Sequence, residues 1–142
     1  MKEQNFKNHV RFVFTWHIIT GLSIIAVIVG SIINLVNATK ETRYSASLLV
    51  LISFILVSIF MYARSFALKA QDRAIRAEEN FRHFILTGEP HHKDIRLRQA
   101  IALRFASDDE MPALAQRAVD EKLSPREIKI AIQNWRPDYR RV

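Results

Sequence analysis

The sequence predicts an all-α protein: a two-helix transmembrane hairpin whose second helix extends into the cytosol, followed by a small three-helix C-terminal cluster. Three observations lead to this prediction. Two long runs carry no Asp, Glu, Lys or Arg, namely 28 residues between Arg11 and Lys40 and 20 residues between Arg43 and Arg64. No glycine or proline interrupts the chain from the second run up to Gly88. Beyond that glycine, capping motifs and prolines delimit short helices.

Both uncharged runs are long enough to cross a bilayer, which requires about 20 apolar residues in a helix. The first run exceeds the roughly 7–15 apolar residues of a signal peptide, and a second run follows it, so a retained span is favoured. We therefore divide the chain into a cytoplasmic N-terminal segment (1–11), transmembrane helix 1 (12–36), an external loop (37–43), transmembrane helix 2 (44–63), a cytoplasmic helical extension (64–87) and a cytoplasmic helical domain (88–142).

The distribution of charge predicts the orientation and the lipid contacts. The chain carries a formal net charge of +7. Residues 64–104 hold nine Lys/Arg and five Asp/Glu, whereas residues 105–142 hold seven of each. Because Lys and Arg accumulate in cytoplasmic segments near membrane spans, both termini are expected in the cytoplasm. The cations directly after the second span are expected to contact anionic lipid headgroups; they are Arg64, Lys69, Arg73 and Arg76.

The residues after Pro90 predict three short helices. Residues 95–106 alternate as in a strand, yet they also form an apolar helix face, and without a second strand to pair with we favour a helix. Ser107 and Glu110 have the spacing of a capping box that opens the next helix, to about Lys122. Ser124 and Glu127 form a second box, and the helix that follows is expected to carry Ile128, Ala131, Ile132 and Trp135 on one face.

The two predicted spans contain seams of small and polar residues at alternating spacings of three and four. In lipid, small residues permit close approach and polar groups bond across an interface. Two compatible interpretations stay open: the seams join the spans to each other, or they pack against a second copy or a partner protein. The first span has Trp16, Thr20, Ser23, Val27, Gly30 and Asn34, and the second has Ser47, Leu51, Phe54, Ser58 and Met61.

The helical extension has a seam with coiled-coil spacing. Alanine permits close approach but buries little area, so this seam alone is expected to associate weakly. It either docks on the C-terminal cluster, with the two phenylalanines as plugs, or joins two copies in a homodimeric stalk. Asp72 with Arg76, and Glu78 with Arg82, are spaced to pair on the exposed sides. The seam consists of Ala67, Ala70, Ala74, Ala77, Phe81 and Phe84.

No constellation of residues indicates catalysis, a metal or a cofactor. The chain has no cysteine and only three glycines, so thiolate chemistry and phosphate-binding loops are excluded. His17 is the one ionisable side chain inside the first span, where an interfacial anchor is favoured over a proton-linked role. The adjacent His91 and His92 point apart on a loop, so a site with His83 and Glu79 is disfavoured. We expect no enzymatic activity.

Residues 116–135 loosely resemble a helix-turn-helix, with Lys122 near the place of the usual turn glycine. Arg126, Lys129, Gln133 and Asn134 then face outward and are able to reach a major groove. Against this interpretation, the distal segment is electrically neutral, whereas phosphate binding requires surplus cations. Two helices of a small bundle, joined by a capped turn, are the favoured interpretation.

The C-terminal stretch resembles an uncharacterised family of small bacterial two-span membrane proteins with a C-terminal cytoplasmic helical domain. The resemblance lies in 93–96, 106–110, Leu123-Ser124-Pro125-Arg126-Glu127-Ile128-Lys129 and Asn134-Trp135-Arg136, and it covers the layout of the whole chain. It implies a multi-pass protein of the bacterial inner membrane and supplies no catalytic residue.

These inferences predict a membrane-anchored interaction, scaffold or accessory protein that acts through its cytoplasmic helical domain. Its expected partners are membrane lipids and a protein partner or second copy, with no nucleic acid and no small-molecule substrate identified. The predicted partner surface consists of Trp135, Arg126 and Lys129. The alternative is a membrane-tethered DNA-binding regulator that uses residues 116–135.

Overall fold

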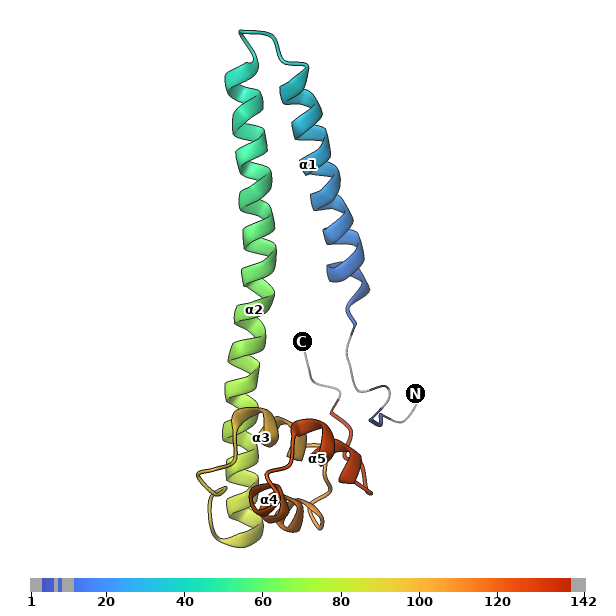
Figure 1. Ribbon diagram of the computed structural model, residues 1–142, viewed down its shortest axis with the longest axis vertical. Coiled ribbons are helices and arrows are strands. Elements are labelled where there is room, and N and C mark those ends of the chain that lie inside the picture. The colour runs from blue at the N-terminus through green and yellow to red at the C-terminus, as the bar shows by residue number, and fades with distance from the viewer. Residues whose placement is uncertain (1–3, 7, 9–11, 139–142) are drawn as a thin grey trace. The chain divides into compact units, whose positions relative to one another are not determined.

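The computed structural model describes residues 4–6, 8 and 12–138, and within this part it is helical and has no β-strand. This confirms the predicted fold class. Residues 95–106 contain a helix and form one isolated bridge, between Ala106 and Trp135, but no strand. In chain order the helices are the π-helix η1 (Thr15–Thr20), α1 (Gly21–Val36), α2 (Arg43–Thr87), α3 (Leu97–Leu103), α4 (Met111–Asp120) and α5 (Pro125–Ala131) (Figure 1).

The chain forms two compact units. The hairpin unit contains Phe12–Phe66. The helical unit contains the residues from Ala67 onward together with the described residues of the N-terminal segment. Two helices, Thr15–Val36 and Arg43–Thr87, are long and apolar enough to cross a membrane.

The first long helix begins with a π-helical turn where the sequence predicted a regular α-helix. The Thr20 hydroxyl donates to the Thr15 carbonyl oxygen, five residues back, at 3.1 Å, and His17 Nδ1 lies 2.8 Å from the Val13 carbonyl oxygen. Polar side chains that bond to carbonyls of the preceding turn are a recognised cause of such irregular turns. The His17 ring also stacks on Phe12, with 4.6 Å between ring centroids.

The hairpin packs through faces that lie one position away from the predicted seams. Ser31 is 7% exposed and Ser53 is fully buried, and their hydroxyl oxygens lie 3.5 Å apart. Ala46 is buried as well, and Trp16 stacks on Phe60 with 4.7 Å between centroids. Small side chains do let the two helices approach, as expected in lipid, but they are not the small side chains that the spacing favoured.

Packing of the two spans through the predicted seam is therefore wrong for most of its residues. Ser23, Val27, Gly30 and Asn34 are exposed, whereas Trp16 and Thr20 are half-buried. A methyl group added to Gly30 would meet no atom within 4 Å. One residue on a helix corresponds to about 100°, so a one-residue shift turns a seam from the partner helix to the outside. The predicted seam of the second helix is exposed too; it consists of Ser47, Leu51, Phe54, Ser58 and Met61.

The last turns of α2 show the same shift of face. Ile75 and Glu79 are each 7% exposed, whereas Phe81 is 64% and Phe84 is 50% exposed. Docking of the alanine seam on the C-terminal cluster, with the phenylalanines as plugs, is therefore wrong, because the neighbouring face is buried instead. The helix ends at Thr87 as predicted, and Gly88 follows with φ 82° while its N–H donates to the Phe84 carbonyl at 2.8 Å.

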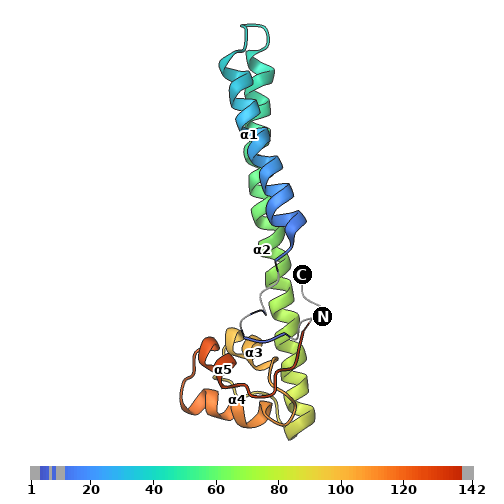
Figure 2. The same cartoon turned by 90° about the vertical axis from the view of Figure 1, so that its right-hand side faces the viewer.

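The helical unit has a core of apolar side chains where α3 packs against α4 and α5 (Figure 2). Phe105 lies just after α3 and is fully buried, as are Leu103, Met111 and Ile128. Burial of side chains of this size stabilises a domain by about 1.5–3 kcal/mol each. A single small core therefore holds the three short helices together.

One of the two predicted capping boxes is present. The Glu127 N–H donates to the Ser124 hydroxyl at 3.2 Å, and the Ser124 N–H donates to Glu127 Oε2 at 2.7 Å. Hydrogen bonds from Ser124 lower the pKa of Glu127. The box predicted for Ser107 and Glu110 is wrong: α4 begins at Met111 and has no side-chain cap.

The last predicted helix is shorter than expected. It ends at Ala131, because Ile132 has extended backbone dihedrals of φ −66° and ψ 124°. Trp135 therefore does not continue the apolar face of α5. Residues 132–138 form a non-helical segment, which we call the C-terminal strap.

Candidate functional site

The C-terminal strap is fixed to the rest of the helical unit by backbone hydrogen bonds. The Arg136 N–H donates to the Phe105 carbonyl at 2.7 Å, and the Ser107 N–H donates to the Asn134 carbonyl at 3.1 Å. These bonds form a short ladder without a sheet. The strap lies against the segment between α3 and α4, which the sequence had predicted to be a helix start.

Glu110 explains why that prediction failed. Its carboxylate accepts from the Asn134 N–H at 2.9 Å, from Asn134 Nδ2 at 3.1 Å and from the Gln133 N–H at 3.3 Å. The acid therefore caps the strap rather than its own helix. Charge-assisted bonds of this kind are roughly twice as strong as neutral ones, so Glu110 is a main attachment point of the strap.

A cluster of stacked groups surrounds Phe105. The Trp135 ring stacks on it with 4.6 Å between centroids and 19° between planes. The Arg104 guanidinium carbon lies 4.4 Å from the Phe105 centroid, and Lys129 Nζ lies 5.5 Å from it. Both distances are within the range of cation–π attraction.

The strap also contacts the N-terminal segment through Gln4. The Asp138 N–H donates to Gln4 Oε1 at 2.7 Å, and Gln4 Nε2 donates to the Asp138 carbonyl at 3.3 Å. The Asp138 carboxylate lies 3.3 Å from the buried Arg104. The strap thereby joins a residue near the start of the chain to the core of the helical unit.

The predicted partner surface is only partly exposed. Trp135 and Lys129 are half-buried through the Phe105 cluster, and Arg126 is exposed. Of the outward side chains of the helix-turn-helix interpretation, Asn134 is bound to Glu110. Lys122 has φ 54°, the left-handed backbone conformation that this turn usually assigns to glycine.

Arg82 joins the last turns of α2 to the segment between α3 and α4. Its guanidinium donates to Glu79 Oε2 at 2.9 Å, to Asp108 Oδ1 at 2.7 Å and to the Ala106 carbonyl at 2.8 Å. The pairing of Arg82 with Glu78 that the spacing predicted is wrong, because Arg82 turns toward the buried face. This network leaves Glu78 on the exposed face of the helix.

Two of the histidines, His83 and His91, are in contact with each other. The rings of His83 and His91 lie 4.4 Å apart between centroids. Burial, followed by the charges of His83, Arg76 and Arg82, lowers the pKa of His91 to about 4. Within residues 4–6, 8 and 12–138, no group of three or more His, Asp or Glu side chains is placed to hold a metal ion.

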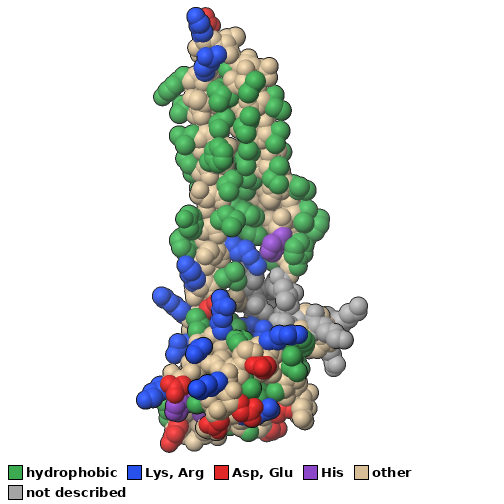
Figure 3. Space-filling model, viewed as in Figure 1, with side chains coloured by type: hydrophobic (Ala, Val, Ile, Leu, Met, Phe, Trp, Pro, Cys, Tyr) green, Lys and Arg blue, Asp and Glu red, His purple; other side chains and the backbone are tan. Residues whose placement is uncertain are grey.

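The predicted lipid-contacting cations all lie on α2. Arg64 is half-buried in the hairpin unit, and the other three are exposed in the helical unit; they are Lys69, Arg73 and Arg76. On the face shown in Figure 3, hydrophobic side chains predominate over the hairpin unit, whereas charged side chains of both signs are numerous over the helical unit.

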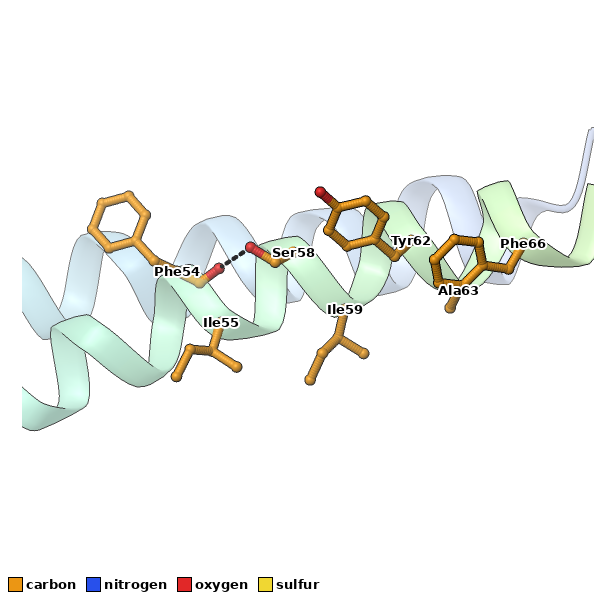
Figure 4. A pocket seen from close by; sticks show the side chains of 7 residues that line it. All are labelled: Phe54, Ile55, Ser58, Ile59, Tyr62, Ala63 and Phe66. Carbon is orange, nitrogen blue, oxygen red and sulfur yellow. Dashed lines mark hydrogen bonds between the residues drawn. The ribbon is translucent and has the colours of Figure 1, made fainter.

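Among the surface hollows of the described residues are two that differ in character, and the sequence predicted neither. One, of about 480 Å³, is formed by one face of α2 alone, where apolar side chains from Phe54 to Phe66 surround Ser58 (Figure 4). The Ser58 hydroxyl donates to the Phe54 carbonyl at 3.1 Å, so its hydrogen is already engaged within the helix, and Tyr62 contributes a second hydroxyl group to the lining. Its lining suits a hydrocarbon chain rather than a polar ligand.

The other hollow is a basic cleft of about 920 Å³ in the helical unit. Leu97, Val119 and Leu123 form part of its apolar lining, and a group of Lys and Arg side chains borders it. Three of these cations, Lys93, Arg96 and Arg98, lie close together in the sequence, which is the one local sign of this cleft. The fourth, Lys122, comes from the turn after α4. The cations are Lys93, Arg96, Arg98 and Lys122.

Comparisons with known proteins agree with the family-level resemblance. The sequence profile of a family of unknown function (DUF6526) matches residues 1–142. Comparisons with curated proteins and with solved structures find no significant match. The chain therefore belongs to this family of unknown function.

Proposed function

We propose that the protein is a membrane-anchored interaction protein, a scaffold or accessory subunit without a catalytic site. The single observation that carries this proposal is the outward exposure of large apolar side chains on both helices of the hairpin unit. Ile25, Ile33 and Ile59 are each 57% exposed, and Leu51 is 56% exposed. Exposed apolar surface on this scale is costly in water and favourable in lipid.

The proposed topology is a multi-pass protein of the bacterial inner membrane with both termini in the cytoplasm. The bonds between Gln4 and Asp138 support it, because they hold the N-terminal segment in the same compact unit as the C-terminal strap. Two spans return the chain to the side from which it started. The excess of Lys and Arg after the second span supports a cytoplasmic helical unit.

The helical unit is the proposed interaction module. Ring stacking and backbone hydrogen bonds join its core to the strap, and its surface carries both the basic cleft and exposed apolar side chains. The exposed cations of α2 supply contacts to anionic lipid, worth at most about 1 kcal/mol each near the surface.

The test is crosslinking in native membranes followed by purification of the full chain. We expect the protein to remain in the membrane fraction after alkaline extraction and to be recovered with a crosslinked protein partner or a second copy. A chain that is strictly monomeric, with no co-purifying partner, would overturn the interaction role. Release by alkaline extraction would overturn the anchor.

A membrane-tethered DNA-binding regulator is the second candidate. The left-handed backbone of Lys122, in the turn between α4 and α5, is the observation that favours it. It is the weaker candidate, because α5 has seven residues and Lys129 lies over the Phe105 ring. Its test is binding of the full chain in nanodiscs to duplex DNA, with affinity that falls as salt rises; no binding at low salt rejects it.

A further inference from the structure

The exposed face of α2 in the helical unit carries an apolar patch. Phe81, Phe84 and Ile85 are 64%, 50% and 65% exposed. They are followed toward the helix start by Ala77 and Ala74, which are also exposed. Contiguous exposed apolar side chains of this kind mark an interaction surface.

The patch has the register of a coiled coil. When Ala74 is assigned to heptad position a, Ala77 falls at d, Phe81 at a and Phe84 at d. The chain's own helical unit covers the other side of the helix, at positions b and f, where Ile75 and Glu79 are buried. The seam and its flanks are thus left open while the opposite face is occupied.

The flanking charges identify the occupant. Arg73 falls at position g and Glu78 at position e of the next heptad, and both are exposed. In a parallel in-register pair, a g side chain faces the e side chain five residues further along the other helix. Two copies of this chain therefore bring each Arg73 beside the Glu78 of the other copy, which forms two ion pairs.

The Arg82 network supports this arrangement. Arg82 bonds to Glu79 and Asp108, so Glu78 does not receive it as an intrahelical partner. The Glu78 carboxylate, which the sequence spacing had paired with Arg82, is therefore available at the edge of the seam. An antiparallel pair would instead set e against e and g against g, which places like charges together.

We propose that residues 67–87 form a parallel, two-fold coiled coil with the same residues of a second copy. The parallel direction rests on the proposed function, because two copies anchored by the same hairpin in one membrane enter the cytoplasm in the same direction. Three heptads rich in alanine associate weakly in solution. Anchoring in one membrane raises the effective concentration and makes the weak seam sufficient.

The test uses single cysteines in the full chain in native membranes, because the sequence has no cysteine and hence no background. Ala74→Cys and Ala77→Cys place thiols at positions a and d, where like residues of a parallel pair are close enough for a disulfide. Arg76→Cys, exposed at position c of the same helix, is the matched control. After oxidation we expect about fivefold or more disulfide dimer at the seam positions than at the control.

Charge exchange tests the ion pairs in the Ala74→Cys background. Arg73→Glu and Glu78→Arg should each lower the dimer yield at least about twofold, and the double exchange should restore it. Failure of the double exchange to restore the yield would overturn the register. Equal crosslinking at the seam and control positions, or no crosslinking at the seam, would overturn the dimer.

Mixed membranes test direction and separate this proposal from the anchor. If Ala74→Cys crosslinks to Phe84→Cys better than to itself, the parallel direction is wrong. Alkaline extraction of the same samples reports the anchor separately. Retained protein without seam crosslinks contradicts the coiled coil alone, whereas released protein with seam crosslinks contradicts the anchor and leaves the coiled coil supported.

Discussion

The two units place similar apolar side chains on opposite sides of their helices. In the hairpin unit, Ser31, Ala46 and Ser53 are buried while isoleucines and phenylalanines point outward. In the helical unit, Leu103 and Phe105 are buried while charged side chains cover the outside. This difference is the one expected if the hairpin unit faces lipid and the helical unit faces water, because apolar burial drives folding in water and gives no advantage between helices in lipid.

In the helical unit, a buried and an exposed phenylalanine should differ most in their contribution to stability. Phe105→Ala removes a fully buried ring and its stacking contact with Trp135. This substitution should lower the free energy of unfolding by about 3–5 kcal/mol. Phe81→Ala, which truncates a 64% exposed ring, should change it by less than about 0.5 kcal/mol. Denaturant unfolding of the full chain in detergent, followed by Trp135 fluorescence in a Trp16→Phe background, measures both. Similar losses from the two variants would contradict the distinction between core and surface.

Two exposed isoleucines, Ile55 in the hairpin unit and Ile130 in the helical unit, allow the two units to be compared directly. Ile55→Arg places a charge on the outer face of the hairpin and should oppose membrane insertion by about 2.5–3.5 kcal/mol. Ile130→Arg is the control, since Ile130 is 57% exposed in the helical unit compared with 48% for Ile55. The fraction of protein retained after alkaline extraction reports insertion. Equal retention of the two variants would mean that the hairpin does not face lipid.

The strap tests how the helical unit is closed. Glu110→Ala removes a carboxylate that accepts three hydrogen bonds from Gln133 and Asn134, at an expected cost of about 1–3 kcal/mol. Hydrogen exchange should accelerate in residues 132–138 before it does in α4. Asp109→Ala, at the exposed neighbouring acid, should leave exchange unchanged. Unaltered protection of the strap in Glu110→Ala would show that backbone bonds alone retain it.

The pH dependence of the helical unit tests the burial of His91. The pKa of His91 is lowered from 6.5 to about 4, chiefly by burial. The unfolded chain therefore binds a proton more readily, so the stabilisation is complete above pH 6.5 and is lost as the pH falls from 6.5 toward 4. His91→Gln should flatten the fall in unfolding free energy across this window, whereas His92→Gln, at an exposed site, should not. Identical profiles for wild type and His91→Gln would contradict this role.

The sequence was sufficient where structure depends on neighbouring residues. The uncharged runs, the helix end at Gly88 and the cap at Ser124 follow from local chemistry, and each is present. The bounds of the short helices were less well predicted, because Ile132 becomes extended in order to lead into the strap.

Side-chain faces could not be predicted in the same way. Apolar residues surround both hairpin helices, so spacing alone does not distinguish Gly30 from Ser31 or Ser58 from Ser53. The actual contact depends on which small residues meet across the hairpin, as Ser31 and Ser53 do. Glu110 was misassigned for a related reason, since its partners lie 23 and 24 residues away along the chain.

The most direct test of the membrane anchor is the accessibility of single cysteines in intact spheroplasts. With a membrane-impermeant thiol reagent, we expect Thr39→Cys, in the loop between α1 and α2, to be labelled from outside. Asp109→Cys, in the helical unit, should be labelled only after the membrane is opened. Labelling of both positions in intact spheroplasts, or of neither until lysis, would contradict a hairpin that crosses the membrane twice with a cytoplasmic helical unit.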